Sequence, residues 1–459
     1  MKSQKATTIL KEAHKAWRNA EELRANRSRQ KQYTYGQQWN DPVTDENGAT
    51  ITEKELAIKN GKRPMTNNLI RQLVKCVVGR FRNNLAENQT SPDSILNKLH
   101  RLNDITELDC RMLEEFLISG CAIQRIVNEK RRQGYGTWVD NVNPDMFFVN
   151  EFADPRAWDI EMIGMLHSMS LTEVIMRFSH NDRNRATALQ QLYACDKITP
   201  GGRFFRAGNG RCRVIEVWTL ESDESLLCHD KSAGELFLST LEAQPSIDKE
   251  NTRRTKKGIA TIDTRWRIDT HWRCRYLAPD GTVLDSFDSP YRHRSHPFVV
   301  KFYPLIDGEV HSFVEDVIDQ QRYINRLIVM IDHIMSSSAK GALLFPANQR
   351  HESMSWEQIA REWSRSDSVI PYNPVGSNPG PQQISANNTN IGAFELLSLE
   401  MKLFEEVSGV GTALMGRGVT AGTGSALYES QIKNATIALA DIFETFNHFR
   451  SERDKKLAG

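Results

Sequence analysis

Apolar residues recur every three or four positions in several segments of the chain, the spacing that places them on one face of an α-helix. The segments are residues 1–31, 67–81, 103–118, 171–178, 312–339, 391–407 and 427–449. The apolar stripe of 312–339 consists of Val317, Ile324, Ile328, Ile331 and Met335. The stripe of 391–407 consists of Phe394, Leu397, Met401 and Phe404. The pattern therefore predicts helices at both ends of the chain, with two long helices in its last third.

A different pattern, the alternation of apolar and polar residues, marks the middle of the chain. It predicts strands at residues 211–220 and 270–277, and two shorter strand-like runs lie at residues 121–127 and 147–149. An Asp280-Gly281 turn follows the last of these and predicts a hairpin. Residues 222–262 are polar and irregular, which indicates an insertion or a loop. The predicted fold class is α+β with antiparallel strands.

Composition excludes several classes of protein. The 459 residues include 59 Lys and Arg against 58 Asp and Glu, a net charge of +1, with 39% hydrophobic and 25% charged residues. This mixture excludes a disordered tail, a collagen-like fibre and a polybasic coat for nucleic acid. The seven cysteines include no C-x-x-C pair, which favours free thiols in a reducing compartment. Because no apolar run is long enough for a signal peptide or a membrane span, we expect a protein made in the cytoplasm without membrane contact.

The small net charge is an average over segments of opposite sign. Residues 1–31 hold nine Lys and Arg against three Glu, which indicates either a solvated helix or an arm that contacts nucleic acid or a partner. The helices over 312–339 and 391–407 are acidic, with net charges of −2 and −3. Their acids can belong to solvated faces, or they can line a pore and repel the DNA backbone. The acids considered for the pore are Glu315, Asp319, Glu395, Glu400 and Glu405.

No segment carries a complete catalytic or metal-binding pattern. Residues 411–418 have the glycine spacing of a phosphate-binding loop, but they lack its Lys and Ser/Thr and follow a helix instead of a strand. His293 and His296 have no further zinc ligands near them in the sequence. A turn and a helix N-terminus explain the small acidic group Glu151, Asp154 and Asp159 better than acid–base catalysis does. We therefore expect no catalytic residue, no metal and no cofactor.

The last third of the chain has a distinctive order of elements. Its two long helices flank residues 346–385, which hold five prolines together with Trp356 and Trp363. Residues 409–425 then contain six glycines and no proline, which predicts a loop before the last helix. The order is therefore helix, compact Pro/Trp element, helix, glycine-rich loop, helix.

Seven short motifs, taken in order, resemble those of the portal proteins of tailed bacteriophages, particularly the short-tailed-phage type. They are Tyr35-Gly36-Gln37-Gln38-Trp39; Arg63-Pro64-Met65-Thr66-Asn67-Asn68 with Val77-Val78-Gly79; Gly120-Cys121-Ala122; Asn143-Pro144 with Asp154-Pro155 and Asp159; Glu216-Val217-Trp218; Gln320-Gln321-Arg322 with Asn325; and Gly424-Ser425-Ala426. Each motif is short, but the set follows the family's order through nearly the whole chain.

The resemblance implies a portal fold with an α/β wing, a two-helix stem, a small α/β clip and a mostly helical C-terminal part. The implied divisions are the wing at 1–311 with its basic N-terminal helix at 1–31, stem helices at 312–339 and 387–410, the clip at 340–386, the tunnel loop at 411–425, and at 426–459 a C-terminal helix towards a short crown. The implied function is structural and not enzymatic. A dodecameric ring would form a channel at one capsid vertex, through which double-stranded DNA is packaged and later ejected.

The same resemblance implies partners and site residues. The partners are other copies of the chain, the terminase large subunit, the major capsid protein, head–tail adaptor and tail proteins, a scaffolding protein, and double-stranded DNA bound without sequence specificity. The implied tunnel-loop residues are Arg417, Gly418, Thr420, Gly422 and Thr423. Trp356 and Trp363 are expected to contact a neighbouring subunit or the motor, or else to pack internally. The alternatives are another head–tail protein of the virion, such as an adaptor or connector, and a nucleotide-binding enzyme.

Overall fold

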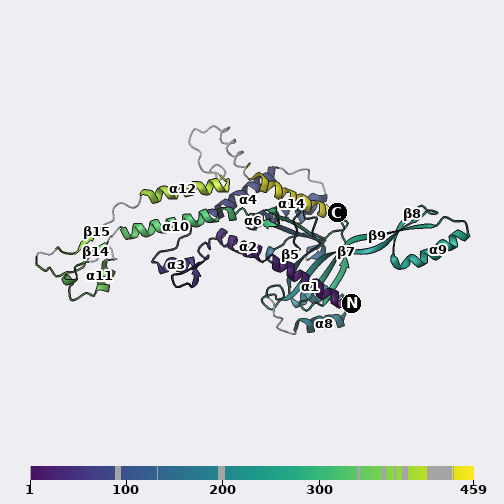
Figure 1. The fold of residues 1–459 in the computed structure, drawn as a ribbon, viewed down its shortest axis with the longest axis horizontal. Helices are drawn as coiled ribbons and strands as arrows, with labels where there is room; N and C mark the ends of the chain where they lie inside the picture. Colours follow the sequence, from purple (N-terminus) through teal and green to yellow (C-terminus); the bar gives the residue numbers. More distant parts are fainter. Residues whose placement is uncertain are drawn as a thin grey trace. The chain divides into compact units, whose positions relative to one another are not determined.

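The computed structural model describes residues 2–87, 95–131, 133–194, 202–338, 342–363, 369–376, 379–384, 391–410, 437 and 439–458. The chain forms two compact units. Unit 1 comprises Met1–Asn26, Phe81–His311 and Ile442–Gly459, and unit 2 comprises Arg27–Arg80 and Ser312–Asp441. Each unit is therefore assembled from segments that lie far apart in the sequence (Figure 1).

Unit 1 is built on antiparallel sheets (Figure 1). The larger sheet has the strand order β10-β9-β7-β6-β5, and β8 pairs with β7 outside this path. Its strands are β5 (Phe147–Val149), β6 (Met162–Met169), β7 (Cys212–Asp230), β8 (Glu235–Thr240), β9 (Ile262–Leu277) and β10 (Val283–Asp288). The second sheet has the order β11-β3-β4, with strands β3 (Cys121–Arg131), β4 (Gly134–Asn141) and β11 (Phe298–Phe302); β12 (Pro304–Ile306) and β13 (Glu309–Val310) form a further pair. The predicted strands and the hairpin that joins β9 to β10 are thus confirmed.

Helices and short 3-10 turns connect these strands. They are α1 (Lys2–Asn19), α5 (Ile95–Leu102), α6 (Ile105–Ser119), η1 (Pro144–Met146), α7 (Leu171–Phe178), α8 (Arg183–Ala194), η2 (Leu241–Ala243) and α9 (Gln244–Lys256). Three helices contribute residues to both units: α2 (Glu21–Thr34), α4 (Leu69–Glu87) and α14 (Ala440–Ala458). The predicted α+β class is therefore confirmed.

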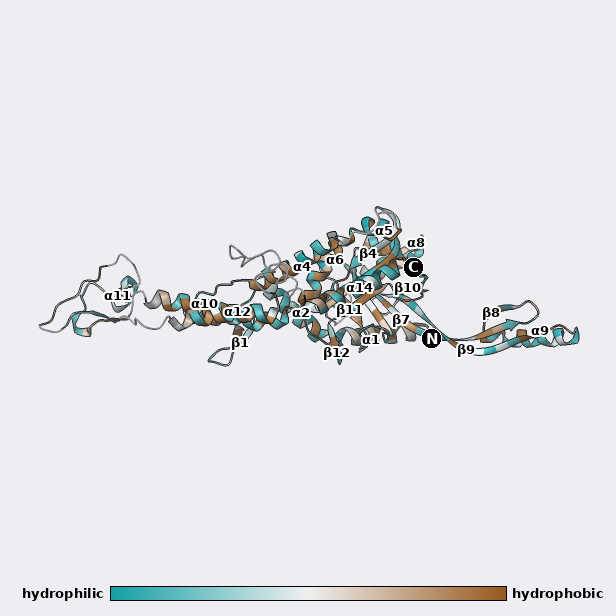
Figure 2. Ribbon diagram, turned by 90° about the horizontal axis from the view of Figure 1, so that it is seen from above, coloured by the Kyte–Doolittle hydropathy of each residue, from teal (hydrophilic) through white to brown (hydrophobic). Residues whose placement is uncertain are grey.

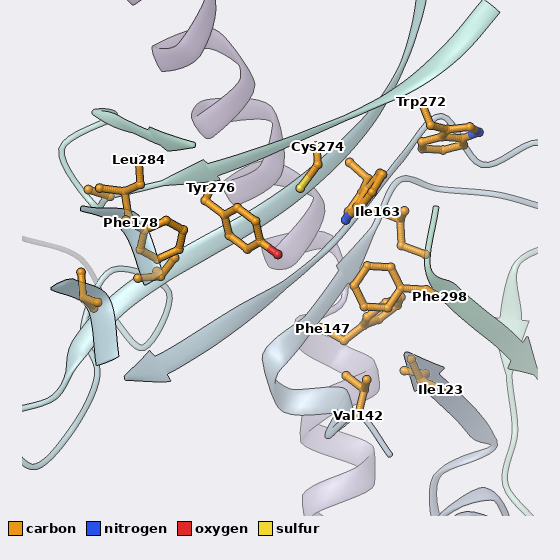
Figure 3. Close-up of a cluster of buried hydrophobic side chains, with 14 of the residues drawn as sticks. Ile123, Val142, Phe147, Ile163, Phe178, Trp272, Cys274, Tyr276, Leu284 and Phe298 are labelled. Carbon is orange, nitrogen blue, oxygen red and sulfur yellow. The ribbon is translucent and has the colours of Figure 1, made fainter. Parts of the chain in front are cut away.

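The core of unit 1 explains the alternating pattern of its strands. Figure 3 shows side chains from both sheets and from α7 meeting in one cluster. Phe147 of β5 meets Phe298 of β11 edge to face, with ring centroids 5.8 Å apart. Tyr276 of β9 packs on Phe178 of α7 at 5.2 Å. Every second residue of these strands points into the cluster, and burial of this apolar surface is the main stabilising contribution.

The prediction of a solvated or DNA-contacting N-terminal helix is wrong for the apolar face of α1. Ala6, Ile9, Leu10, Ala13 and Ala16 are buried against the larger sheet, in a second cluster that includes residues of β5, β6 and β7. The sequence emphasised the charge of this segment, but its small and aliphatic residues recur at helical spacing and cover the sheet. Lys11 and Lys15 of the same helix are exposed.

Residues 222–262 were predicted as an insertion or a loop, and the loop alternative is wrong. Strand β7 continues to Asp230 and pairs with β9 through every residue from Leu220↔Trp272 to Asp230↔Ile262. Strand β8 joins the outer half of this ribbon, and α9 packs on it through Ile247. The ribbon leaves the rest of the sheet, so many of its side chains are solvated and its sequence lacks the alternation of a half-buried strand.

Gly164 on β6 marks the closest approach in the sheet of unit 1. A Cβ atom at this position would lie 2.1 Å from the carbonyl oxygen of Glu216 and 2.4 Å from the Phe148 ring. We expect Gly164→Ala to lower the free energy of unfolding by about 1–3 kcal/mol, because a packed strand and a ring cannot both move aside. Chemical denaturation would measure this loss. Gly79→Ala is the matched control, because Gly79 lies in α4 with open space around it and should be neutral or slightly stabilising.

Unit 2 contains two long helices, α10 (Glu315–Ser338) and α12 (Ile391–Ser408), which lie side by side in both ribbon views (Figures 1 and 2). Beyond the last turn of α10 come β14 (Ala342–Leu344), η3 (Ala347–Gln349), α11 (Trp356–Trp363) and β15 (Gln382–Ile384), which precedes α12. Because β14 and β15 pair antiparallel, the chain returns along its outward path and the two helices are antiparallel. The rest of the unit is β1 (Pro42–Thr44), β2 (Thr50–Thr52) and α3 (Glu53–Lys59) with parts of α2 and α4.

Candidate functional site

The helix α12 presents an apolar stripe that nothing in the described part of unit 2 covers. Phe404 and Ser408 are buried, with exposed fractions of 2% and 3%. Leu399, Leu403 and Val407 are exposed by 52%, 36% and 46%, and they recur at the helical spacing of four residues. A row of exposed leucine and valine on one helix is unusual for an isolated soluble chain and indicates a partner surface.

The acids that the sequence grouped together do not share one face. Asp319 and Glu395 are exposed, whereas Glu400 and Glu405 are half-buried. At 3.6 residues per turn, Glu400 lies about 140° around the helix from Glu395. The Glu315 carboxylate is hydrogen-bonded within unit 2. It caps the start of α10 by accepting a hydrogen bond from the Ser312 amide, and it accepts another from the Gln30 side chain at 3.3 Å.

The first turns of α10 hold a buried polar cluster. The Gln321 side chain accepts a hydrogen bond from the Leu69 amide at 2.8 Å and donates one to the Asn67 carbonyl at 2.7 Å. Asn325 accepts the Asn67 amide at 3.0 Å and donates to Oε1 of Gln38 at 2.6 Å. Three of the seven motifs therefore meet here, and their polar residues anchor α10 to the start of α4 and to the end of α2.

Charged groups surround this polar cluster. Arg322 donates to Glu53 at 3.0 Å, and Arg326 forms a second ion pair with the same carboxylate. Asp41 accepts hydrogen bonds from Arg29 and from the Tyr33 hydroxyl at 2.8 Å. Burial, followed by the hydrogen bond to Asp41, raises the pKa of Tyr33 above its ordinary value, so the hydroxyl stays protonated as a donor. The cluster fixes the base of the helix pair and contains no group poised for catalysis.

The two predicted tryptophans lie on α11, seven residues apart. At 3.6 residues per turn this spacing places them within about 20° of one another around the helix. Trp356 is 47% exposed and meets Phe345 edge to face at 5.8 Å, whereas Trp363 is half-buried. The tunnel-loop residues Arg417, Gly418, Thr420, Gly422 and Thr423 lie outside the described residues.

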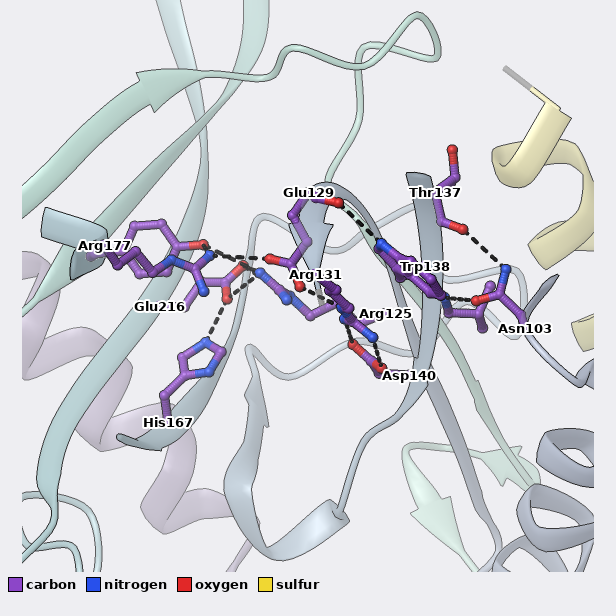
Figure 4. Close-up of polar contacts among 12 residues, drawn as sticks. Asn103, Arg125, Glu129, Arg131, Thr137, Trp138, Asp140, His167, Arg177 and Glu216 are labelled. Atoms are coloured by element: carbon purple, nitrogen blue, oxygen red, sulfur yellow. Dashed lines mark hydrogen bonds and ion pairs between the residues drawn. The ribbon is translucent and has the colours of Figure 1, made fainter. Parts of the chain in front are cut away.

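A second buried network, in unit 1, explains the Glu-x-Trp motif. Figure 4 shows that the Glu216 carboxylate forms an ion pair with the Arg125 guanidinium and a hydrogen bond with the His167 ring. The N–O distances are 2.9 Å to Arg125 and 2.7 Å to His167. The Trp218 indole also donates to Glu216 at 2.8 Å, and Arg125 reaches the Tyr276 hydroxyl at 3.2 Å. Burial alone would raise the pKa of Glu216, but Arg125 and the hydrogen bonds from His167 and Trp218 outweigh it and hold that pKa far below the ordinary range. The carboxylate is therefore a permanent, fully engaged anion that joins two sheets, and not an acid–base catalyst.

The remaining candidates are structural as well. Asp159 accepts hydrogen bonds from the backbone amides of Ala153 and Asp154, so the acidic group forms a turn, as predicted. The helix that was also predicted to begin here is not present at residues 151–160. His296 is buried against Trp272, with ring centroids 4.7 Å apart. Within the described residues no cluster of three or more histidine, cysteine or acidic side chains could hold a metal ion. No helix in that part of the chain is long and apolar enough to cross a membrane.

Comparison with known families identifies the family of this chain. The family model described as phage P22-like portal protein matches residues 10–453. The chain belongs to this family. This portal protein forms the channel at a capsid vertex through which phage DNA is packaged. Its family is structural and not enzymatic, acts as a ring of identical subunits within the virion, and interacts with the capsid and the terminase. No curated protein matches the sequence.

Sequence motifs of the portal protein located the side chains of the α10 polar cluster, but only part of the Glu216 network. Glu216 and Trp218 were found because they form a family motif, as were Gln321 and Asn325. Arg125 and His167 lie 91 and 49 residues from Glu216, so no local spacing connects them. The position of Arg125 inside the strand-like run 121–127 was an available signal, since a buried charge requires a partner.

The pH dependence of the portal subunit follows from its buried histidines. Burial lowers the pKa of His167, His293 and His296. The nearby charge of Lys456 lowers the pKa of His293 and His296 further, and the pKa of His293 is about 4. Below about pH 6.5 these histidines bind protons in the unfolded chain but stay neutral in the folded chain. The free energy of unfolding therefore falls as the pH drops from 6.5 towards 4. Thermal unfolding measured between pH 7 and 4 should show this loss.

A variant isolates the contribution of one histidine. His293→Gln keeps an acceptor for the Ser295 amide, which His293 Nδ1 now accepts at 3.1 Å, but removes the titrating group. We expect the slope of the unfolding midpoint against pH to be shallower in this variant. An unchanged slope would contradict the assignment to His293.

Proposed function

We propose that this portal subunit assembles as a dodecameric ring in which α10 and α12 form the stem around the DNA path, residues 340–386 the clip, and residues 411–425 the tunnel loop. Residues 1–311 would form the wing, and 426–459 would lead towards a short crown. The observation that carries the proposal is the antiparallel pair of α10 and α12, joined at one end through the β14–β15 pair and α11. In a portal-family chain, this is the segment whose shape suits a channel wall.

The uncovered face of α12 supports packing of the stem against a neighbouring copy. Leu399, Leu403 and Val407 lie on it, one helical turn apart. Burying such a stripe between neighbouring subunits would remove apolar surface from water at every interface of the ring. We place the ring contact here.

The acids of the stem support a channel that DNA does not stick to. Our channel-lining candidates are the exposed Asp319 and Glu395 and the half-buried Glu400 and Glu405, whereas Glu315 serves mainly as the helix cap. Repeated around a ring, exposed carboxylates would repel the phosphates and leave double-stranded DNA free to move in packaging and ejection. Such contacts carry no base readout, so we propose binding without sequence specificity.

The partners are assigned by region. The terminase large subunit and later the adaptor and tail proteins would dock at the clip, where Trp356 offers an exposed aromatic surface and Trp363 lies on the same side of α11. The major capsid protein and a scaffolding protein would contact the wing. Arg417, the one charged residue of the predicted loop, would touch DNA phosphates together with Gly418, Thr420, Gly422 and Thr423.

Negative-stain electron microscopy of the purified chain tests the assembly. Rings with a central hole of duplex-DNA width, about twelve-fold symmetric, are the expected result. Monomers at all concentrations, or closed icosahedral shells, would contradict the proposal.

The loop assignment has its own test. Deletion of residues 417–424 should leave rings intact but reduce DNA packaging, because the loop would act on DNA and not between subunits. A Gly/Ser segment of the same length is the matched control, and it separates loop length from the chemistry of Arg417. Loss of rings in the deletion variant would show that these residues serve assembly instead.

A further inference from the structure

Unit 1 contains a hollow of about 580 Å³ that the channel function does not use. Its floor is apolar and includes Phe147, Phe302 and Leu305. Its rim carries the exposed carboxylates of Glu151, Asp159 and Asp307, and no lysine or arginine is among the described residues that line it. A hollow of this kind fits an apolar side chain that is accompanied by positive charges.

The tip of the β7–β9 ribbon carries the complementary chemistry. The ribbon ends at two turns, residues 230–234 and 257–261, which Arg254 ties together by its ion pair with Asp230 and its hydrogen bond to the Ala260 carbonyl. At this tip Lys256, Lys257 and Ile259 are exposed, with 45% of Ile259 accessible. An exposed isoleucine beside two lysines matches an apolar floor beside carboxylates.

A single copy cannot join its own tip to its own hollow. Beyond the last residues paired with β6, the ribbon continues from Leu220↔Trp272 to Asp230↔Ile262. Ten steps of about 3.3 Å carry the tip roughly 33 Å away from the sheet. The hollow is lined by residues of α1 and of β5, the edge strand of that sheet. Figure 1 shows the ribbon leading away from α1 and β5.

We propose that the ribbon tip of one subunit docks in the hollow of the next, with Ile259 on the apolar floor and Lys256 and Lys257 against the rim carboxylates. The proposal rests on the ring proposed above. A closed ring needs two different, complementary patches on the same chain, because its interfaces are head-to-tail. The tip and the hollow are such a pair, separate from the apolar stripe of α12.

Charge reversal and its compensation test the contact. Lys256→Glu/Lys257→Glu should lower the ring-to-monomer ratio roughly fivefold at fixed protein concentration, since rim ion pairs contribute modestly. Glu151→Lys/Asp307→Lys should do the same, and the four substitutions together should restore much of the loss. Sedimentation velocity measures the ratio, and far-UV circular dichroism verifies that each variant is folded.

The controls separate this contact from the ring itself. Lys54→Glu/Lys62→Glu reverses two exposed lysines of unit 2 and should leave the ratio unchanged. If the wild-type chain forms no rings, the proposed function fails. If it forms rings that the tip and rim variants do not weaken, or if the combined variant restores nothing, the ring stands and the docking contact is overturned.

Discussion

Replacing Leu399 and Leu403 with glutamate is expected to yield a folded subunit that does not form rings. Both side chains are exposed within the chain, so the substitutions leave the described packing of unit 2 intact. Burial of a leucine contributes about 1.5–3 kcal/mol, and a charge in the same place adds a desolvation cost. Each subunit contact should therefore weaken at least about a hundredfold, which sedimentation velocity and electron microscopy would detect as monomers.

Two further variants on α12 make this result specific. Ser398→Glu adds the same charge on the polar side of the helix, next to Glu395 and Lys402, and should leave rings in place. Phe404→Glu places the charge in the buried seam, and should lower the thermal unfolding midpoint. Rings of wild-type stability in the double leucine variant would show that this stripe faces something other than a neighbouring subunit.

Glu216→Ala is expected to destabilise unit 1 more than other single substitutions of its polar residues. The change leaves the Arg125 guanidinium buried, with a side-chain exposed fraction of 7%, and without its carboxylate. Breaking a buried ion pair from one side costs about 3–5 kcal/mol. His167 and Trp218 lose their acceptor as well. Equilibrium denaturation in urea would measure the loss.

The matched control removes both charges. Arg125→Met/Glu216→Leu replaces the pair with apolar side chains of similar length, so no buried charge is left alone. We expect this double variant to be markedly more stable than Glu216→Ala, because the cost of the single change comes mainly from the orphaned guanidinium. Equal destabilisation of the two variants would contradict this explanation.

The errors of the sequence reading have identifiable causes. Residues 222–262 were predicted as an insertion or a loop because strand prediction relies on alternation, and alternation arises only where one face is buried. The ribbon is held by its backbone ladder to Asp230↔Ile262, which needs no apolar pattern. Likewise, the stripe drawn through Phe394, Leu397, Met401 and Phe404 has the right period, but Phe394 and Met401 are exposed and Phe404 is buried.

The sequence by itself determined many of the helices and strands, their order and the family, because local periodicity, capping residues and short motifs lie in neighbouring positions. It also named Glu216, Gln321 and Asn325. Only the tertiary structure decided what these residues do, since Arg125 lies 91 residues from Glu216 and Asn67 lies 254 residues from Gln321. The same holds for α1 and α12: periodicity shows that a helix has an apolar face, but only the packing of distant segments decides which face is covered and which stays exposed.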